Sequence, residues 1–153
     1  VFGFAKRWPE RVNCIYAEAP VCDIKSWPGG KGSGEGDLKM WQKLIEAYGL
    51  SGEKDALEYN DNPIDKLEKL AAAKVPLFFS IGLNDSIVPP EENTYKLLNN
   101  YIRLGGPATV YPNTIGVQTL KGHHFPIDNL KAGTDFIRNS YPEMSIPLGS
   151  QKD

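Results

Sequence analysis

The chain has 153 residues, of which 41% are hydrophobic and 24% are charged, the proportions of an ordinary globular domain with a packed core. Its 17 basic and 19 acidic residues leave a net charge of −2, which argues against a nucleic acid or an anionic membrane bound through bulk charge. No apolar run approaches the roughly 20 residues that a membrane-spanning helix needs.

The N-terminus shows no basic stretch followed by an apolar one, so it does not resemble a secretion signal. The chain opens with Val1 inside a predicted helix, and we therefore expect it to be part of a longer protein. A targeting segment would then lie outside this sequence, and the compartment and the oligomeric state stay open.

Hydrophobic periodicity and turn residues predict helices that alternate with strands. The predicted helices cover residues 2–8, 38–48, 52–59, 66–73, 91–104 and 129–140. The predicted strands cover residues 12–17, 75–81 and 108–111, and 117–120 is a candidate continuation of the last one beyond a kink at Pro112. The residues expected to face inward from three of the helices are Leu38, Trp41, Leu44, Ile45 and Tyr48, then Tyr95, Leu98 and Ile102, and finally Leu130, Phe136 and Ile137.

This alternation predicts the α/β class, with a parallel sheet that carries helices on both faces. Residues 1–140 are expected to form one domain, or part of one, with a small helical insertion over about 24–73. Residues 141–153 are expected to be a loosely packed tail.

The two cysteines differ in their predicted surroundings. Cys14 falls in a predicted buried strand and Cys22 in the loop that follows. A disulfide between them would require a sharp reversal of the chain, so two packed thiols are the favoured interpretation and a bridge stays open. The cysteines therefore leave the redox compartment undecided.

Glycine-rich residues 29–36 invite comparison with a phosphate-binding loop. The spacing does not fit, because Lys31 is followed by Gly32 rather than by Ser or Thr, and no strand leads the segment into a helix. A flexible loop is the favoured interpretation, with Asp37 as the cap of the next helix.

Two polar residues follow two successive predicted strands. Asp85 comes directly after the apolar strand at 75–81, and His123 follows the last strand in the segment Lys121-Gly122-His123-His124. Carboxyl ends of parallel strands meet at one edge of a sheet, where α/β folds bind ligands. An aspartate that accepts the imidazole Nδ1–H fixes the tautomer of a catalytic histidine, so the pair is a candidate for the acid and the base of a charge relay.

Each of these residues also has a purely structural interpretation. Asn84, Asp85 and Ser86 are good turn formers, and either histidine could lie on the surface or pack beneath the loop. Zinc ligation by His123, His124 and Asp128 is not favoured, because adjacent histidines point in different directions, so no metal is predicted. His123 is preferred as the base because Gly122 lets the loop turn back over the sheet edge.

A series of segments resembles the α/β-hydrolase superfamily, and within it the prolyl-oligopeptidase-like and esterase-like branch of bacterial carbohydrate-degrading systems. The segments are residues 15–23, 62–65, 76–93 and 122–124. The resemblance implies the C-terminal half of such a domain, a catalytic serine in a G-x-S-x-G turn upstream of Val1, and no cofactor. The stretch from Thr109 to Leu120 is longer than in the family.

The resemblance also suggests a substrate pocket lined by Glu18, Asp23 and Trp27, which follow the first strand. Glu18 is the alternative relay acid to Asp85, since a family variant places the acid there. Trp27 could stack on a sugar or an aromatic ring, or simply anchor the loop.

The sequence thus predicts part of a serine hydrolase, a carboxylesterase that acts on small-molecule or carbohydrate esters. The alternatives are a peptidase of the same branch, a non-catalytic binding domain on the same fold, and, more distantly, a flavodoxin-like domain, for which the required phosphate loop is lacking.

Overall fold

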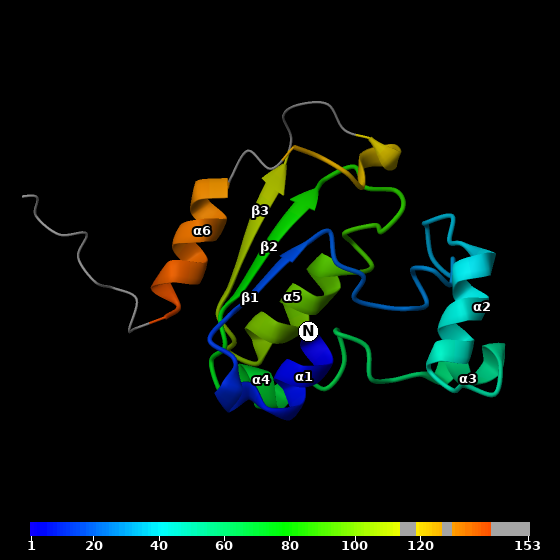
Figure 1. Ribbon diagram of the computed structural model, residues 1–153, viewed down its shortest axis with the longest axis horizontal. Coiled ribbons are helices and arrows are strands. Elements are labelled where there is room, and N and C mark those ends of the chain that lie inside the picture. The colour runs from blue at the N-terminus through cyan, green and yellow to red at the C-terminus, as the bar shows by residue number, and fades with distance from the viewer. Residues whose placement is uncertain (114–118, 127–129, 142–153) are drawn as a thin grey trace, which may run out of the picture.

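β2 (Leu77–Gly82) is the central strand of a three-stranded parallel sheet with the order β1-β2-β3 (Figure 1). The computed structural model describes residues 1–113, 119–126 and 130–141. β1 (Ile15–Glu18) pairs with β2 from Ile15 opposite Leu77, and β3 (Ala108–Asn113) pairs with it from Ala108 opposite Leu77. Every residue of β2 is buried, as its unbroken apolar run predicts.

Helices cover both faces of the sheet, which confirms the predicted α/β class (Figure 1). One face packs on α1 (Phe2–Arg7), α4 (Glu68–Ala72) and α5 (Thr94–Arg103) in a single apolar core. The other face receives α6 (Leu130–Asn139), where the ring of Phe136 lies 5.2 Å from that of Phe78. Gly133 of α6 lies so close to Tyr16 that a Cβ atom would fall 2.7 Å from its ring.

A second, smaller apolar cluster lies in the segment between β1 and β2. Trp41 of α2 (Leu38–Ala47) packs there with Ile24 and with Ala56 of α3 (Glu53–Glu58). Asp37 caps α2, since its carboxylate accepts the Met40 N–H at 2.9 Å, as the sequence predicts. α4 follows in the same segment but belongs to the main core through Leu70 and Ala71.

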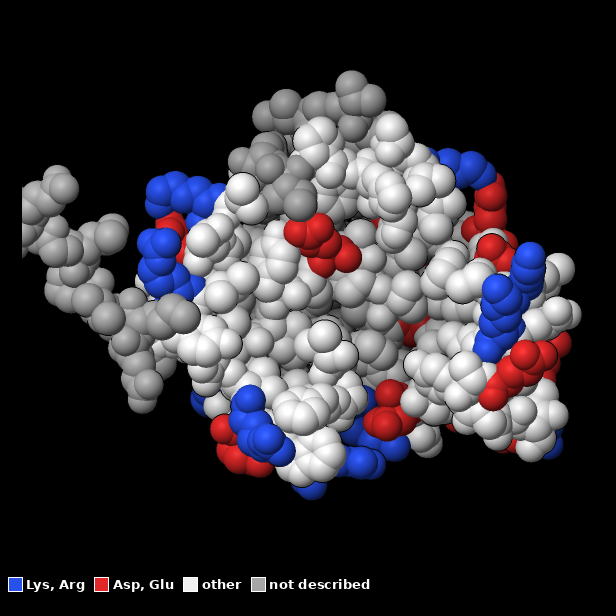
Figure 2. Space-filling view, in the orientation of Figure 1, with Lys and Arg blue, Asp and Glu red and all other residues white. Residues whose placement is uncertain are grey.

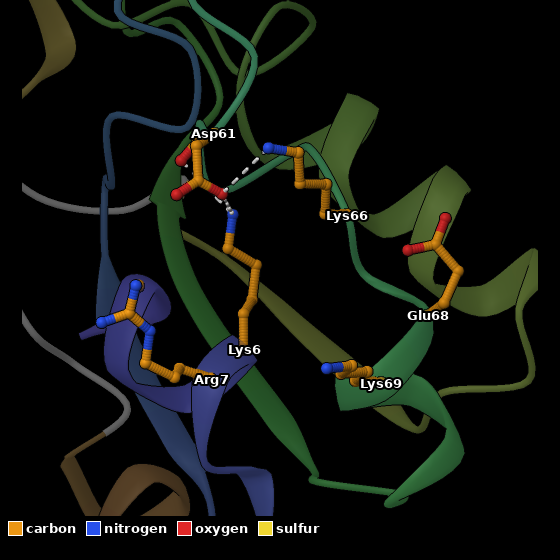
Figure 3. Close-up of a pocket in the computed structure, with 7 residues that line it drawn as sticks. Lys6, Arg7, Asp61, Lys66, Glu68 and Lys69 are labelled. Carbon is orange, nitrogen blue, oxygen red and sulfur yellow. Dashed lines mark hydrogen bonds and ion pairs between the residues drawn. The ribbon is translucent and has the colours of Figure 1, made fainter.

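Lys6 joins α1 to the turn that precedes α4 (Figure 3). Its side chain is only 7% exposed, and its ammonium group donates to the Asp61 carboxylate at 2.9 Å and to the carbonyl oxygens of Asp61, Asn62 and Asp65 at 2.8–3.3 Å. Arg7, Lys66 and Lys69 surround the same hollow of about 310 Å³. The Lys6 ammonium group already has four oxygen partners. We therefore interpret these contacts as structural, because they hold α1 against the turn that precedes α4.

Several predicted element ends and faces are wrong. Cys14 lies outside β1 and is only half-buried, whereas Cys22 is fully buried, and both cysteines are free. β3 continues through Pro112 to Asn113 where a kink was expected. Of the candidate continuation at 117–120, residues 117 and 118 lie outside the described ones, Thr119 forms an isolated antiparallel bridge with His124, and Leu120 begins a short 3-10 helix. α5 begins three residues later than predicted, at Thr94.

The predicted inward faces are only partly correct. Trp41, Leu98 and Phe136 pack as expected, and Leu44 and Ile45 are half-buried. The residues that are exposed against expectation are Leu38, Tyr48, Tyr95, Ile102, Leu130 and Ile137. The core instead takes Leu97 and Tyr101 from α5 and Gly133 from α6.

No helix in the described part of the chain is long and apolar enough to cross a membrane. The face in Figure 2 carries acidic and basic side chains side by side over α2 and α3, and a small acidic patch over the end of β1. This distribution agrees with the small net charge of the whole chain.

Candidate functional site

Asp85 lies in the turn directly after β2, at the carboxyl edge of the sheet. Its side chain is 2% exposed, and its Oδ1 accepts the backbone N–H groups of Ile87 and Val88, both at 2.9 Å. A carboxylate that bonds the backbone two and three residues ahead is a common turn device, so the structural role expected of this segment is present. The same two bonds fix the orientation of the carboxylate and leave Oδ2 directed at another loop.

That other loop brings His123 to Asp85. Nδ1 of His123 lies 2.7 Å from Oδ2 of Asp85, and the imidazole is 24% exposed. The loop is fixed by a short antiparallel bridge, in which Thr119 and His124 exchange backbone hydrogen bonds of 2.9 and 3.1 Å. His123 itself donates its backbone N–H to the Leu120 carbonyl at 3.0 Å. The position of the imidazole is therefore fixed by the Asp85 carboxylate and by the backbone hydrogen bonds of the turn that contains His123.

Two glycines allow the two loops to approach this closely. A Cβ on Gly82 would lie 2.4 Å from the Gly122 carbonyl oxygen, and a Cβ on Gly122 would lie 2.5 Å from the Asn84 carbonyl oxygen. Gly122 also has a φ of +89°, which an L-residue with a side chain rarely adopts. Any larger residue at either position would separate the loops that carry the Asp85–His123 pair.

An open pocket of about 400 Å³ lies beside His123. Glu18, Ala19, His124 and Phe125 line it together with His123. Glu18 ends β1 and accepts a hydrogen bond of 2.7 Å from the Tyr16 hydroxyl. Burial, with the hydrogen bond to Glu18 and its negative charge, raises the pKa of Tyr16 to about 12, so the phenol stays protonated and keeps donating. The carboxylate of Glu18 is thereby fixed at the rim of the pocket.

The predicted site residues fall into two groups. Asp85, His123 and Glu18 meet at the carboxyl edge of the sheet, and it is Asp85, not Glu18, that is bonded to His123. Asp23 lies elsewhere, buried and paired with Lys25 at 3.2 Å and Lys96 at 3.6 Å. Trp27 is half-buried and is not among the residues that line the pocket at His123.

Sequence reasoning missed a polar network beneath the glycine-rich residues. Asn93 is fully buried, its Oδ1 accepts the backbone N–H groups of Cys22 and Asp23, and its Nδ2 donates to the Ser26 hydroxyl. Ser26 donates in turn to Glu92 at 2.7 Å. The sequence Glu91-Glu92-Asn93 could have indicated such a network. It is equally typical of the polar start of a helix, however, and it does not indicate which residues would bind it.

The structure provides no test of the zinc interpretation that involves Asp128, because this residue lies outside the described ones. Within the described residues, no group of three or more His, Cys, Asp or Glu side chains could hold a metal ion. The chain matches no protein-family model, and a search of curated proteins finds no match to it either.

Proposed function

We propose that this chain carries the acid and the histidine of a Ser-His-Asp hydrolase of the α/β-hydrolase type, with the nucleophilic serine contributed by a segment upstream of Val1. The observation that supports it is the 2.7 Å contact between a buried, oriented carboxylate and a histidine that opens onto a pocket. Sequential parallel strands deliver the two residues to one sheet edge in the order acid then histidine.

The geometry supports a definite division of roles. Asp85 accepts the Nδ1–H of His123, which makes Nε2 the basic nitrogen. Nε2 takes the proton of the serine hydroxyl as that oxygen attacks the ester carbonyl, and the imidazolium is stabilised by the Asp85 carboxylate. The same proton then passes to the leaving alkoxide, and water repeats the sequence to release the acid.

The Ser86 hydroxyl does not serve as the nucleophile in this scheme, although it follows Asp85 directly. It contacts the Lys121 carbonyl oxygen at 3.4 Å, and its backbone N–H donates to the same oxygen at 3.0 Å. These contacts fix the Asp85 turn against the histidine loop. The upstream nucleophile is the one that the family resemblance implies.

The pocket supports an ester substrate with hydroxyl groups. The Glu18 carboxylate is a hydrogen-bond acceptor for sugar-like hydroxyls, and Phe125 provides an aromatic surface beside it. A carboxylate at the rim also disfavours anionic substrates through repulsion. Carbohydrate esters and other neutral hydroxylated esters are therefore the proposed substrate class.

Labelling of the full-length parent protein with a fluorophosphonate tests this proposal. We expect one serine upstream of Val1 to be labelled, and we expect both His123→Ala and Asp85→Asn to slow labelling by about 10³-fold or more. Glu58→Ala is the control, because it removes an exposed carboxylate of α3 that does not line the pocket and should leave the labelling rate unchanged. A folded parent that shows no labelled serine would overturn the hydrolase proposal and leave a binding domain.

Hydrolysis assays then separate the esterase from the peptidase alternative. Acetylated sugars and aryl esters should be cleaved, and peptide amides should not. Cleavage of peptides with no cleavage of esters would contradict the proposed substrate class while leaving the role of the Asp85–His123 pair intact.

A further inference from the structure

The glycine-rich loop, residues 29–36, lies against the turn that follows Asp85. Gly34 is buried, and a Cβ at this position would lie 3.1 Å from both the Ile87 carbonyl oxygen and Cδ of Pro89. Ile87 is one of the two residues whose N–H groups orient the Asp85 carboxylate. The loop therefore packs directly on the backbone that fixes the acid.

The same loop also reaches the histidine turn. The Glu35 carboxylate is hydrogen-bonded to the Lys121 ammonium, two positions before His123. Lys121 adopts a positive φ of 53°, and its carbonyl oxygen accepts the Ser86 N–H of the Asp85 turn at 3.0 Å. Lys121 thus contacts the glycine-rich loop through its side chain and the Asp85 turn through its backbone.

Glu92 anchors the loop from below, just before α5. Its carboxylate accepts the backbone N–H of Ser33 and the hydroxyl of Ser26, and the Ser26 hydroxyl accepts a hydrogen bond of 2.9 Å from Asn93. Gly32 lies so near that a Cβ would fall 2.2 Å from the carboxylate. Burial alone would raise the pKa of Glu92, but the hydrogen bonds from Ser33 and Ser26 outweigh it and the pKa is lowered. The anchor is therefore a charged acceptor at neutral pH.

We propose that the glycine-rich loop braces the Asp85 and His123 turns against each other, and that Glu92 is the positioning residue that anchors this brace. The three contacts are made by a loop that has no regular secondary structure. Backbone hydrogen bonds from Gly29, Gly30 and Lys31 hold the first part of this loop, so the three contacts matter most for residues 32–35. The Glu35–Lys121 pair is 68% and 53% exposed, and a pair of that kind contributes little by itself. Glu92 is half-buried and holds two partners, so most of the effect should come from it.

Amide hydrogen exchange on Glu92→Ala tests the brace directly. Loss of the two hydrogen bonds should accelerate exchange about tenfold or more in residues 31–35, 86–88 and 121–124, while the amides of β2 keep their rates. In the same variant the Nδ1 proton resonance of His123 should broaden or vanish, because the bond to Asp85 is no longer held. A change confined to these turns is what a positioning role predicts.

Two further variants make the test specific. Glu91→Ala is the matched control, because it removes a neighbouring exposed carboxylate and should leave exchange and the resonance as they are. Glu92→Gln still accepts from the Ser33 N–H and should restore at least half of the lost protection. The proposal is wrong if Glu92→Ala matches Glu91→Ala. It is also wrong if β2 exchanges faster by the same factor as the turns, since Glu92 would then only stabilise the whole fold.

The consequence for catalysis rests on the proposed function. In an active parent, Glu92→Ala should lower kcat about tenfold or more with little change in KM, because the ester contacts of the pocket remain. If the wild-type parent shows no hydrolysis and no labelled serine, the proposed function fails, while the exchange and resonance results still decide whether the brace exists.

Discussion

Gly122→Ala is the substitution that most directly tests why Asp85 and His123 meet. The φ of +89° at Gly122 costs an alanine about 1–2 kcal/mol, because its Cβ meets the neighbouring carbonyl oxygen. The new methyl group would also lie 2.5 Å from the Asn84 carbonyl oxygen and 2.9 Å from the Asp85 nitrogen. Both are backbone atoms, so no side-chain rotation relieves the contact, and the two loops must move apart.

The size of that movement decides the outcome. An ordinary separation of about 3.5 Å requires a shift of about 1 Å, and the same shift would stretch the 2.7 Å contact between Asp85 and His123 beyond hydrogen-bond range. Loss of a charge-assisted bond to a partly exposed imidazole adds about 1–2 kcal/mol. We therefore expect Gly122→Ala to lower the free energy of unfolding by about 2–4 kcal/mol in total.

Gly49→Ala isolates the effect of close approach. Gly49 also has a positive φ, of +64°, but a Cβ there would meet nothing within 4 Å, so only the backbone cost of about 1–2 kcal/mol remains. Urea unfolding measures both variants, and the Nδ1 proton resonance of His123 reports the pair. If Gly122→Ala is no less stable than Gly49→Ala and keeps that resonance, close approach of the two loops is not what holds the pair.

Further predictions concern three buried side chains, those of Lys6, Cys22 and Tyr101. Lys6→Met removes a donor from three carbonyl oxygens, of which that of Asn62 keeps the Asp65 N–H as a backbone donor, and it should cost about 2–4 kcal/mol in urea unfolding. The hydrogen bond from Lys6 lowers the pKa of Asp61, so its contribution is present above about pH 4 and is lost as the pH falls through the lowered pKa. The penalty should accordingly shrink in acid, by less than about 1 kcal/mol, since Asp61 is 51% exposed; a penalty that grows in acid would contradict this. Burial and the nearby Asp23 charge raise the pKa of Cys22 to about 12, so iodoacetamide at pH 8 should modify Cys22 only after the protein unfolds. Rapid modification of Cys22 in the folded protein would show that this thiol is not buried. Tyr101→Phe removes a hydroxyl that donates to the Leu70 and Val75 carbonyls at 3.1 and 2.6 Å and should cost about 1–3 kcal/mol, whereas an unchanged urea midpoint would exclude a role for these bonds.

The sheet and the pair at its edge were predictable because each rests on local sequence. β2 is an unbroken apolar run, and a strand of that kind is buried on both faces wherever it lies in a parallel sheet. Asp85 and His123 each follow a strand, and parallel strands bring their carboxyl ends to one edge whatever the lengths of the connections. The pair could therefore be predicted without knowledge of distant packing, although Glu18 stayed open as the alternative acid and the structure places Asp85 against His123.

The inward-facing sides of the helices were harder to predict, because apolar residues occur on more than one side of α5 and α6. On α5, Tyr95 and Ile102 fit the helical period as well as Leu97 and Tyr101 do. Tyr101 faces the core because its hydroxyl donates to the carbonyl oxygens of Leu70 in α4 and of Val75 just before β2, and no pattern within α5 reveals these partners. The loop contacts of Glu92, Ser26 and Lys121 escaped prediction for the same reason, since they join residues far apart in the chain.

The geometry of the pair has a consequence for the nucleophile proposed upstream. Asp85 is oriented by amides of its own turn, and His123 by its own bridge, by Gly122 and by the acid. All of these contacts lie within the described residues, so in the proposed hydrolase the acid and the base are positioned before the upstream nucleophile takes its place beside them. With Nδ1 bonded to Asp85, Nε2 is the nitrogen that the proposed serine would approach, and His123 also lines the pocket together with Glu18 and Phe125. A preformed pair of this kind lowers the reorganisation needed during the proposed reaction, because the charge that develops on the imidazole meets a carboxylate already in place.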